Sequence, residues 1–85
     1  MLDLEKLDEG LSKLTGLDYE EAARAERAVG NNAVALATDE RFLIRLAAIA
    51  LETNANELKA LPIKDYMLIY SRTLNFLFTS EATPT

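Results

Sequence analysis

Residues 39–53 read DERFLIRLAAIALET, and this stretch decides the fold. On a helical wheel, at about 100° per residue, its apolar side chains cover almost the whole circumference. One side carries Phe42, Leu43, Leu46, Ile49 and Ala50, and the other carries Ile44, Ala47 and Leu51. Only Arg41, Arg45 and Glu52, with Ala48 between them, form a polar strip. Because such a helix packs on several sides and is too short and too charged to cross a bilayer, the stretch predicts a central helix over 39–53.

A first helix is predicted over residues 3–15. Leucines at positions 4, 7, 11 and 14 recur at helical spacing, and Asp3 precedes them as an N-cap. Gly10 lies inside this pattern and weakens it by about 1 kcal/mol relative to alanine. Thr15-Gly16 is expected to end the helix, with Gly16 in the left-handed conformation.

A second helix is predicted over 18–29, capped by Asp18 with a glutamate three residues later. Residues 30–32, Gly-Asn-Asn, break the pattern. Residues 33–37 are small and apolar and fit a helical turn, an extended connector or an edge strand, and we assign them as connector. Thr38 is then expected to cap the central helix.

After the central helix, Asn54 is expected to cap a short helix over 55–61, and Pro62 suits the first turn of a final helix over 62–78. The inward stripe of that last helix is predicted to comprise Ile63, Tyr66, Met67, Tyr70, Leu74, Leu77 and Phe78. Residues 79–85, TSEATPT, have no apolar anchor and are expected to form a mobile tail. The sequence therefore predicts an all-α fold, a bundle of four to five helices in one domain over 1–78.

The composition argues against several classes of protein. The chain contains no cysteine and no histidine, so thiolate metal sites and the commonest general base are missing. There is no glycine-rich phosphate loop and no serine with a suitable base, so we expect neither an enzyme nor a cofactor. Residues 1–20 lack the apolar segment of a secretion signal, so we expect an intracellular protein without membrane attachment.

The net charge of −5 is unevenly distributed. Residues 1–40 hold ten acidic side chains against four basic ones, which argues against a nucleic-acid surface and leaves either a basic partner or a merely solvated face. The run LAAIALETNANELKALP has the general pattern of a helix-turn-helix motif. However, its second helix would offer one lysine and one asparagine to the bases, so we do not expect DNA binding.

The last helix carries more apolar surface than one neighbour requires. Ile69 and Phe76 are predicted on a flank away from the inward stripe, and Leu68 lies on the far side near Arg72. Two interpretations remain open: a second packing surface for a partner helix or another copy of the chain, or a flank covered by the N-terminal helices. The candidate protein-binding residues are Leu68, Ile69, Arg72 and Phe76.

The second half of the chain contains, in order, Asp39, Phe42-Leu43, Leu46-Ala47-Ala48, Glu57-Leu58, Leu61-Pro62-Ile63-Lys64-Asp65-Tyr66 and Asn75-Phe76-Leu77. In these features it resembles the small tail assembly chaperones of long-tailed bacteriophages. Two earlier fragments, Leu14-Thr15-Gly16-Leu17-Asp18 and Ala25-Glu26-Arg27, also resemble the family. The resemblance covers residues 14–78, and its most specific part is the Leu-Pro-x-x-Asp-aromatic step followed ten residues later by Asn-Phe-Leu.

This resemblance implies a helical, non-enzymatic protein that acts in the cytoplasm of the infected or lysogenic host. It implies binding to the tape measure protein, which is thereby kept soluble, and recruitment of the major tail protein, with homo-oligomers common in the family. It assigns no binding residue. The alternative is a small helical regulator that binds and inhibits a host or phage protein, and a gene located between those for the major tail and tape measure proteins would favour the chaperone.

Overall fold

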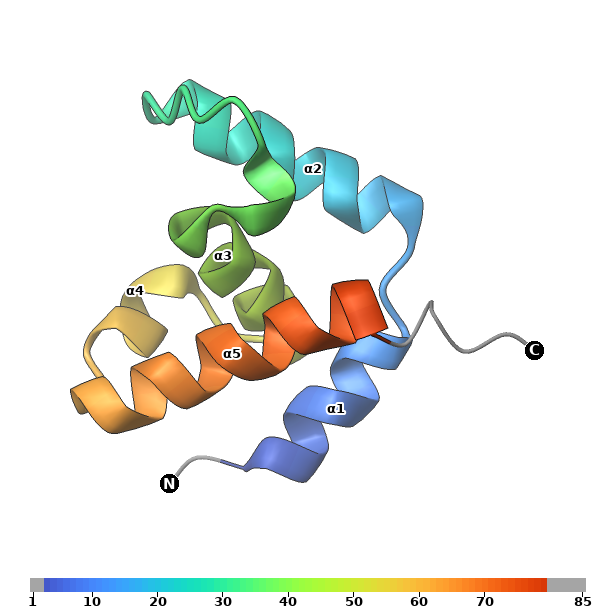
Figure 1. Cartoon of the computed structure of the whole chain (residues 1–85), viewed down its shortest axis with the longest axis vertical. Coiled ribbons are helices and arrows are strands. Elements are labelled where there is room, and N and C mark those ends of the chain that lie inside the picture. The colour runs from blue at the N-terminus through green and yellow to red at the C-terminus, as the bar shows by residue number, and fades with distance from the viewer. Residues whose placement is uncertain (1–2, 80–85) are drawn as a thin grey trace.

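The computed structural model describes residues 3–79, and this part of the chain is all-α, as the sequence predicts. The elements are α1 (Leu4–Ser12), α2 (Gly16–Ala28), the 3-10 turn η1 (Leu36–Thr38), α3 (Glu40–Ala50), α4 (Ala55–Lys59) and α5 (Ile63–Thr79) (Figure 1). No strand occurs between residues 3 and 79. The tail expected at 79–85 lies outside the described residues, apart from Thr79, which is the last residue of α5.

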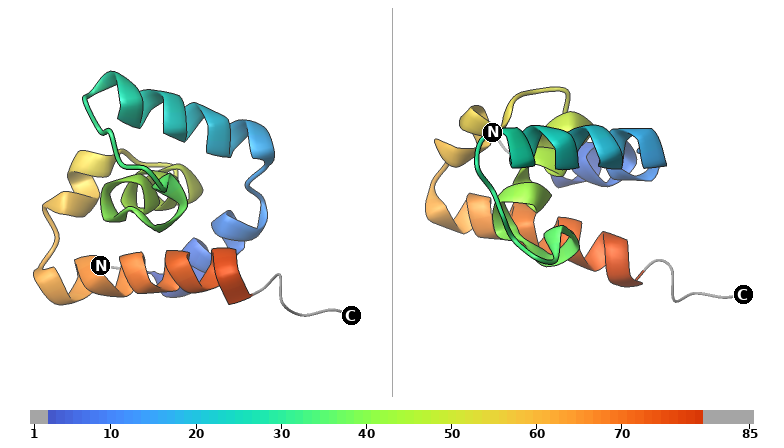
Figure 2. Two further views of the ribbon diagram at one scale, coloured as in Figure 1. Left: turned by 45° about the horizontal axis from the view of Figure 1, so that its top comes forward. Right: turned by 90° about the horizontal axis from the view of Figure 1, so that it is seen from above.

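The prediction of a central α3 is confirmed. In the left view of Figure 2, α3 is seen nearly end-on, with α2 above it, α4 beside it and α5 below it. Of its residues, Phe42, Leu43, Ile44 and Ala47 are completely buried. Because apolar residues cover most of its circumference, each of the other helices and η1 packs against it.

Two clusters of side chains form the core around α3. One joins α3 to α1, α4 and α5, with buried members Leu7, Leu11, Ile44, Ala47, Ala48, Ala50, Leu58 and Ile69. The other joins α3 to α2 and η1, with buried members Ala22, Leu36, Phe42, Leu43 and Leu46. Tyr19 packs edge-on against Phe42 in the second cluster, with ring centroids 4.8 Å apart.

Gly10 marks the point where α1 crosses α3. A Cβ atom at this position would lie 2.1 Å from the carbonyl oxygen of Ala50, which is shorter than any normal contact. The glycine therefore allows the two backbones to approach closely, a role that the leucine pattern of the first helix does not reveal.

The start of α2 differs from the prediction. The helix expected at 18–29 begins earlier, because Thr15 is its N-cap and Asp18 is the reciprocal partner in a capping box. Gly16 consequently lies in the first turn of α2 and not in a left-handed position. The sequence prediction placed the box one turn too late because Asp18 also suits an N-cap.

α3 is also shorter at both ends than the helix predicted over 39–53. Asp39, and not Thr38, caps the helix, since its carboxylate accepts the Phe42 N–H at 3.1 Å. The helix ends at Ala50 because Glu52 adopts a left-handed φ of 59°, and the Thr53 N–H turns back to the Ala48 carbonyl. By contrast, the predicted N-caps Asp3 and Asn54 are confirmed.

Candidate protein-binding surface

The inner face of α5 is rotated relative to the prediction. Ile69 and Thr73 are completely buried, and Tyr66, Tyr70 and Leu77 pack beside them. The flank at Ile69 is covered by α1, so the first of the two interpretations, a free packing surface, does not hold at Ile69. The alternative, in which N-terminal helices cover that flank, is the arrangement observed.

The four candidate residues occupy four different environments. Ile69 is a core residue, and the Arg72 guanidinium donates two hydrogen bonds, of 3.1 and 2.9 Å, to the carboxylate of Asp8 in α1. Phe76 is half-buried, whereas Leu68, at 46%, and Arg72 are exposed. The structure therefore does not bring all four side chains together on one accessible face.

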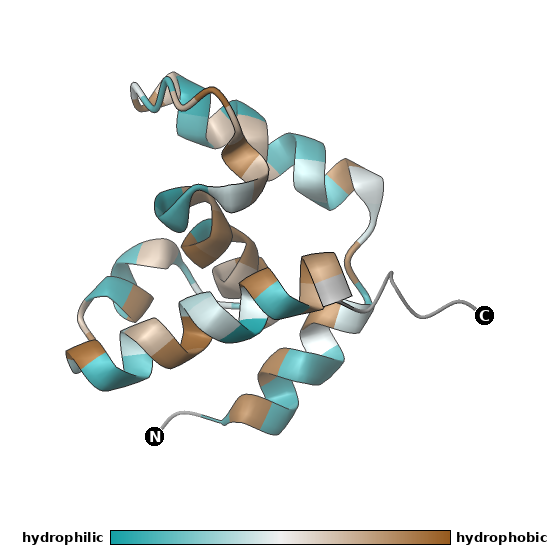
Figure 3. Ribbon diagram, in the orientation of Figure 1, coloured by the Kyte–Doolittle hydropathy of each residue, from teal (hydrophilic) through white to brown (hydrophobic). Residues whose placement is uncertain are grey.

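An exposed apolar surface instead follows the opposite flank of α5. Ile63, Met67 and Phe78 are 74%, 44% and 53% exposed, and the half-buried Tyr70 and Leu74 lie between them along the helix. We refer to Ile63, Met67, Tyr70, Leu74 and Phe78 as the α5 seam. Figure 3 colours the ribbon of α5 and of the other helices by the hydropathy of each residue.

Three residues of the seam were therefore assigned to the wrong side of the helix. Ile63, Met67 and Phe78 were predicted to point inward, and their exposure shows that this is incorrect. The polar residues of the helix do not by themselves give the correct orientation. An inward stripe drawn opposite Ser71, Arg72 and Asn75 centres on Tyr66 and Leu77, and the apolar pattern fits more than one rotation of the helix.

A charged group borders the seam near the start of α5. Ile63, Lys64, Met67 and Leu68 line a shallow hollow of about 450 Å³, so Lys64 lies on one edge. Tyr66, in the same part of the helix, packs against the core. Burial of the Tyr66 hydroxyl and its interaction with Glu40 raise the pKa of that hydroxyl to about 12.

A second cleft lies at the other end of α5, where α1 joins α2. It has a volume of about 320 Å³ and its apolar lining includes Leu11, Tyr19, Leu46, Phe76 and Leu77. Asp8 pairs with Arg72, and one turn further along each helix Leu11 and Phe76 line this cleft, so α1 and α5 run in the same direction. Phe76 thus contributes to a junction between helices and not to the α5 seam.

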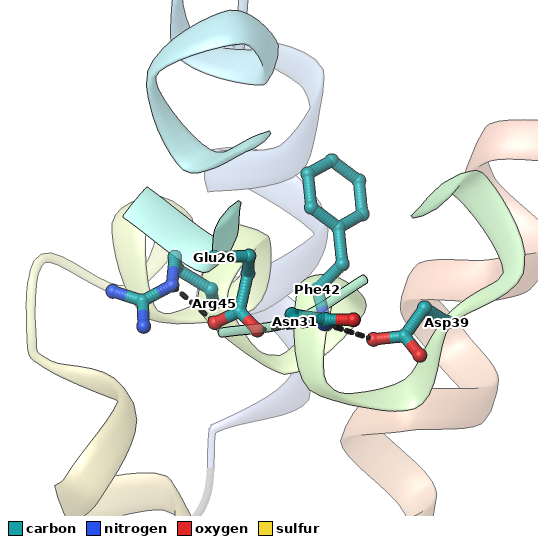
Figure 4. A network of polar contacts seen from close by, with 5 residues as sticks. All are labelled: Glu26, Asn31, Asp39, Phe42 and Arg45. Carbon is teal, nitrogen blue, oxygen red and sulfur yellow. Dashed lines mark hydrogen bonds and ion pairs between the residues drawn. The ribbon is translucent and has the colours of Figure 1, made fainter. Parts of the chain in front are cut away.

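A polar network fixes the segment between α2 and α3 (Figure 4). Gly30, with φ of 95°, ends α2 and turns the chain so that the Asn31 N–H donates to the Glu26 carbonyl. The buried Asn31 amide then donates to the carboxylates of Glu26 and Asp39, at 2.8 Å each. Arg45 completes the network through its ion pair with Glu26.

The network holds its two carboxylates in the ionised form. Burial acts to raise the pKa of Glu26, but the hydrogen bond from Asn31 and the interactions with Arg45 outweigh it and the pKa is lowered. Burial likewise opposes ionisation of Asp39, whose pKa is lowered by hydrogen bonds from Asn31 and from the Phe42 N–H. Because every buried polar side-chain atom in the described chain has a partner, we interpret this network as structural.

Comparisons of the chain with protein-family models, curated proteins and solved structures gave no match. Within residues 3–79, no three acidic side chains converge in a way that could hold a metal ion. In the same range no helix is long and apolar enough to span a membrane. The α5 seam is thus the feature of the described chain that most clearly suggests a binding function.

Proposed function

We propose that the protein is a tail assembly chaperone of a long-tailed phage and that it binds the tape measure protein through the α5 seam. The observation that carries this proposal is the exposed apolar seam on a small helical protein with a net charge of −5. An acidic protein of this kind remains soluble while it presents apolar surface to a partner. The resemblance of residues 14–78 to these chaperones supplies the identity of the partner.

The spacing of the seam suits a helical partner. Successive members are four, three, four and four residues apart, close to the repeat with which one helix packs along another. A tape measure protein is a very long helical chain whose apolar stripes would aggregate if uncovered. Covering such a stripe with the seam would bury apolar surface on both chains.

The same resemblance supports two further parts of the proposal. The protein would act in the cytoplasm of the bacterial host, where tails are assembled, and it would be absent from the finished tail. It would also help to recruit the major tail protein to the coated tape measure. Both the cytoplasmic location and the recruitment of the major tail protein are inferred from the resemblance and not from the seam.

The proposal is tested by co-purification with overlapping fragments of the tape measure protein of the same phage. We expect at least one fragment to bind the unmodified protein, and the double variant Ile63→Ser with Met67→Ser to lose that binding. Circular dichroism should show unchanged helicity, because both side chains are already exposed.

The matched control is Leu17→Ser with Val34→Ser, which also removes two apolar side chains, at positions that are 76% and 99% exposed and do not belong to α5. This control variant should bind like the unmodified protein. Absence of binding to every fragment, or an equal loss in both double variants, would contradict the proposal.

A further inference from the structure

The hollow at the start of α5 combines three apolar side chains with one cation. Ile63, Met67 and Leu68 are exposed apolar residues, and Lys64 is the remaining residue of its lining. At about 100° per residue, Lys64 lies between Met67 and Leu68 around the helix. Its ammonium group makes no ion pair or hydrogen bond within residues 3–79. A partner that covers the hollow therefore also meets an unpaired positive charge.

The charges of α5 are divided between its two sides. Lys64 and Arg72 are exposed, whereas Asp65, the one acidic residue of the helix, is half-buried. Asp65 is two positions before Met67, so it points to nearly the opposite side of the helix from the seam. Arg72 is already paired with Asp8 of α1, which leaves Lys64 as the cation of α5 that is available to a partner.

We propose that the α5 seam selects an amphipathic helix with acidic side chains beside its apolar stripe, one of which pairs with Lys64. This inference rests on the proposed function, because it describes the segment of the tape measure protein that would bind. Apolar side chains that cover the hollow remove water from around Lys64, and a cation that loses water is stabilised by an anionic partner. A segment with basic residues beside its stripe would place like charges together.

The remaining charge of the protein makes this choice selective. Residues 1–40 hold ten acidic side chains against four basic ones, so they repel an acidic segment. Such a segment finds apolar surface next to an unpaired cation at the start of α5. Attraction there and repulsion elsewhere together direct it to the seam.

The preference is tested with two synthetic helical peptides of equal length, used at concentrations where each is monomeric. Both carry leucines at alternating spacings of four and three, and the stripe is bordered by glutamates in one peptide and by lysines in the other. Titration calorimetry should show tighter binding of the glutamate peptide. The net charge of −5 by itself would favour the lysine peptide, so the two explanations predict opposite orders.

The role of Lys64 is tested by Lys64→Glu, which should weaken binding of the glutamate peptide by about tenfold or more. An acidic residue suits the first turn of a helix, so the helicity of this variant should be unchanged. The matched control is Lys6→Glu, which makes the same change of charge at an exposed residue of α1 that lines a different hollow. Tighter binding of the lysine peptide, or an equal loss in both variants, would overturn the inference.

Tape measure fragments separate this inference from the proposed function. In a fragment that binds, exchanging the acidic residues beside the apolar stripe for lysine should weaken binding to the unmodified protein and restore binding to Lys64→Glu. A fragment that requires Ile63 and Met67 but is unaffected by Lys64→Glu would overturn the acidic preference and leave the chaperone function intact. Binding of the glutamate peptide through Lys64, with no fragment bound, would overturn the chaperone function alone. A seam already covered by a second copy, seen as a dimer in sedimentation equilibrium that neither peptide displaces, would also overturn the inference.

Discussion

At the scale of single residues, Gly10 shows how local and tertiary preferences oppose each other. In an isolated helix, replacing this glycine with alanine would be favourable by about 1 kcal/mol. In the folded protein the added Cβ would meet the backbone of Ala50 at the crossing of α1 and α3. A backbone atom cannot move aside as the end of a side chain can, so the tertiary constraint prevails.

We therefore predict that Gly10→Ala destabilises the protein by about 1–3 kcal/mol, as overpacking typically does. Chemical denaturation followed by circular dichroism measures this change. Gly16→Ala is the matched control, because a Cβ there has no neighbouring atom within 4 Å. The control should leave stability unchanged or raise it by up to about 1 kcal/mol, and equal effects at both positions would show that the close crossing is not what selects the glycine.

Glu26, Asn31 and Asp39 show what residue types alone do not reveal. The sequence predicts a chain break at Gly-Asn-Asn, but nothing in it states that Asn31 becomes fully buried and joins two carboxylates. The side chain reaches them because the left-handed Gly30 folds the chain back over the end of α2. A residue that marks a turn in the sequence thus becomes part of the packing in the structure.

At the scale of the elements, α5 has apolar residues on more than one face, and its orientation decides which of them are exposed. Ile69 and Leu68 are neighbours of similar size in the sequence, yet one is fully buried and the other is 46% exposed. The difference arises because α1 runs alongside α5 and covers the Ile69 flank, with Arg72 and Asp8 paired at its border.

We predict that Ile69→Ala lowers the free energy of unfolding by about 2–5 kcal/mol, since it leaves a cavity between α1, α3 and α5. Leu68→Ala, which removes a side chain of the same volume, should change stability by less than about 1 kcal/mol. Urea unfolding of both variants provides the comparison. A large effect at Leu68 together with a small one at Ile69 would mean that α5 packs through the other flank.

At the scale of the whole molecule, the polar network ties α2 and the connector to α3, so stability should depend on pH. The pKa values of Glu26, Asp39 and Asp8 are lowered in the folded state relative to 4.5 for glutamate and 3.8 for aspartate. For such groups the stabilisation is fully present above the unfolded pKa and is lost as the pH falls through the folded pKa. Asp8, whose pKa is lowered mainly by its hydrogen bond from Arg72, contributes little because both side chains are close to half exposed.

We therefore predict that the free energy of unfolding is constant from neutral pH down to about 4.5 and declines as the pH falls further. Glu26→Gln should be less stable than the unmodified protein at neutral pH, because Arg45 loses its ionised partner. The two proteins should approach each other in stability at acidic pH, where Glu26 is protonated. Urea unfolding across this pH range tests the prediction, and a constant difference between the two proteins would contradict it.

The sequence by itself determined the all-α class, the central position of α3 and the approximate limits of the helices. These features follow from the number and spacing of apolar residues and from capping side chains, which act over a few residues along the chain. Asn54 before α4 and the apolar circumference of α3 are examples in which such local rules sufficed.

Only the tertiary structure decided which flank of α5 is free, why α1 needs glycine at its crossing, and how Asn31 links Glu26 to Asp39. Each of these depends on contacts between segments of the chain. A helix with apolar residues on several faces can be rotated about its axis and still bury an apolar face, so its sequence pattern alone does not select the rotation. The choice between rotations is made by the total packing of α1, α3 and α5, in which burying Ile69 and Thr73 leaves Ile63 and Met67 exposed.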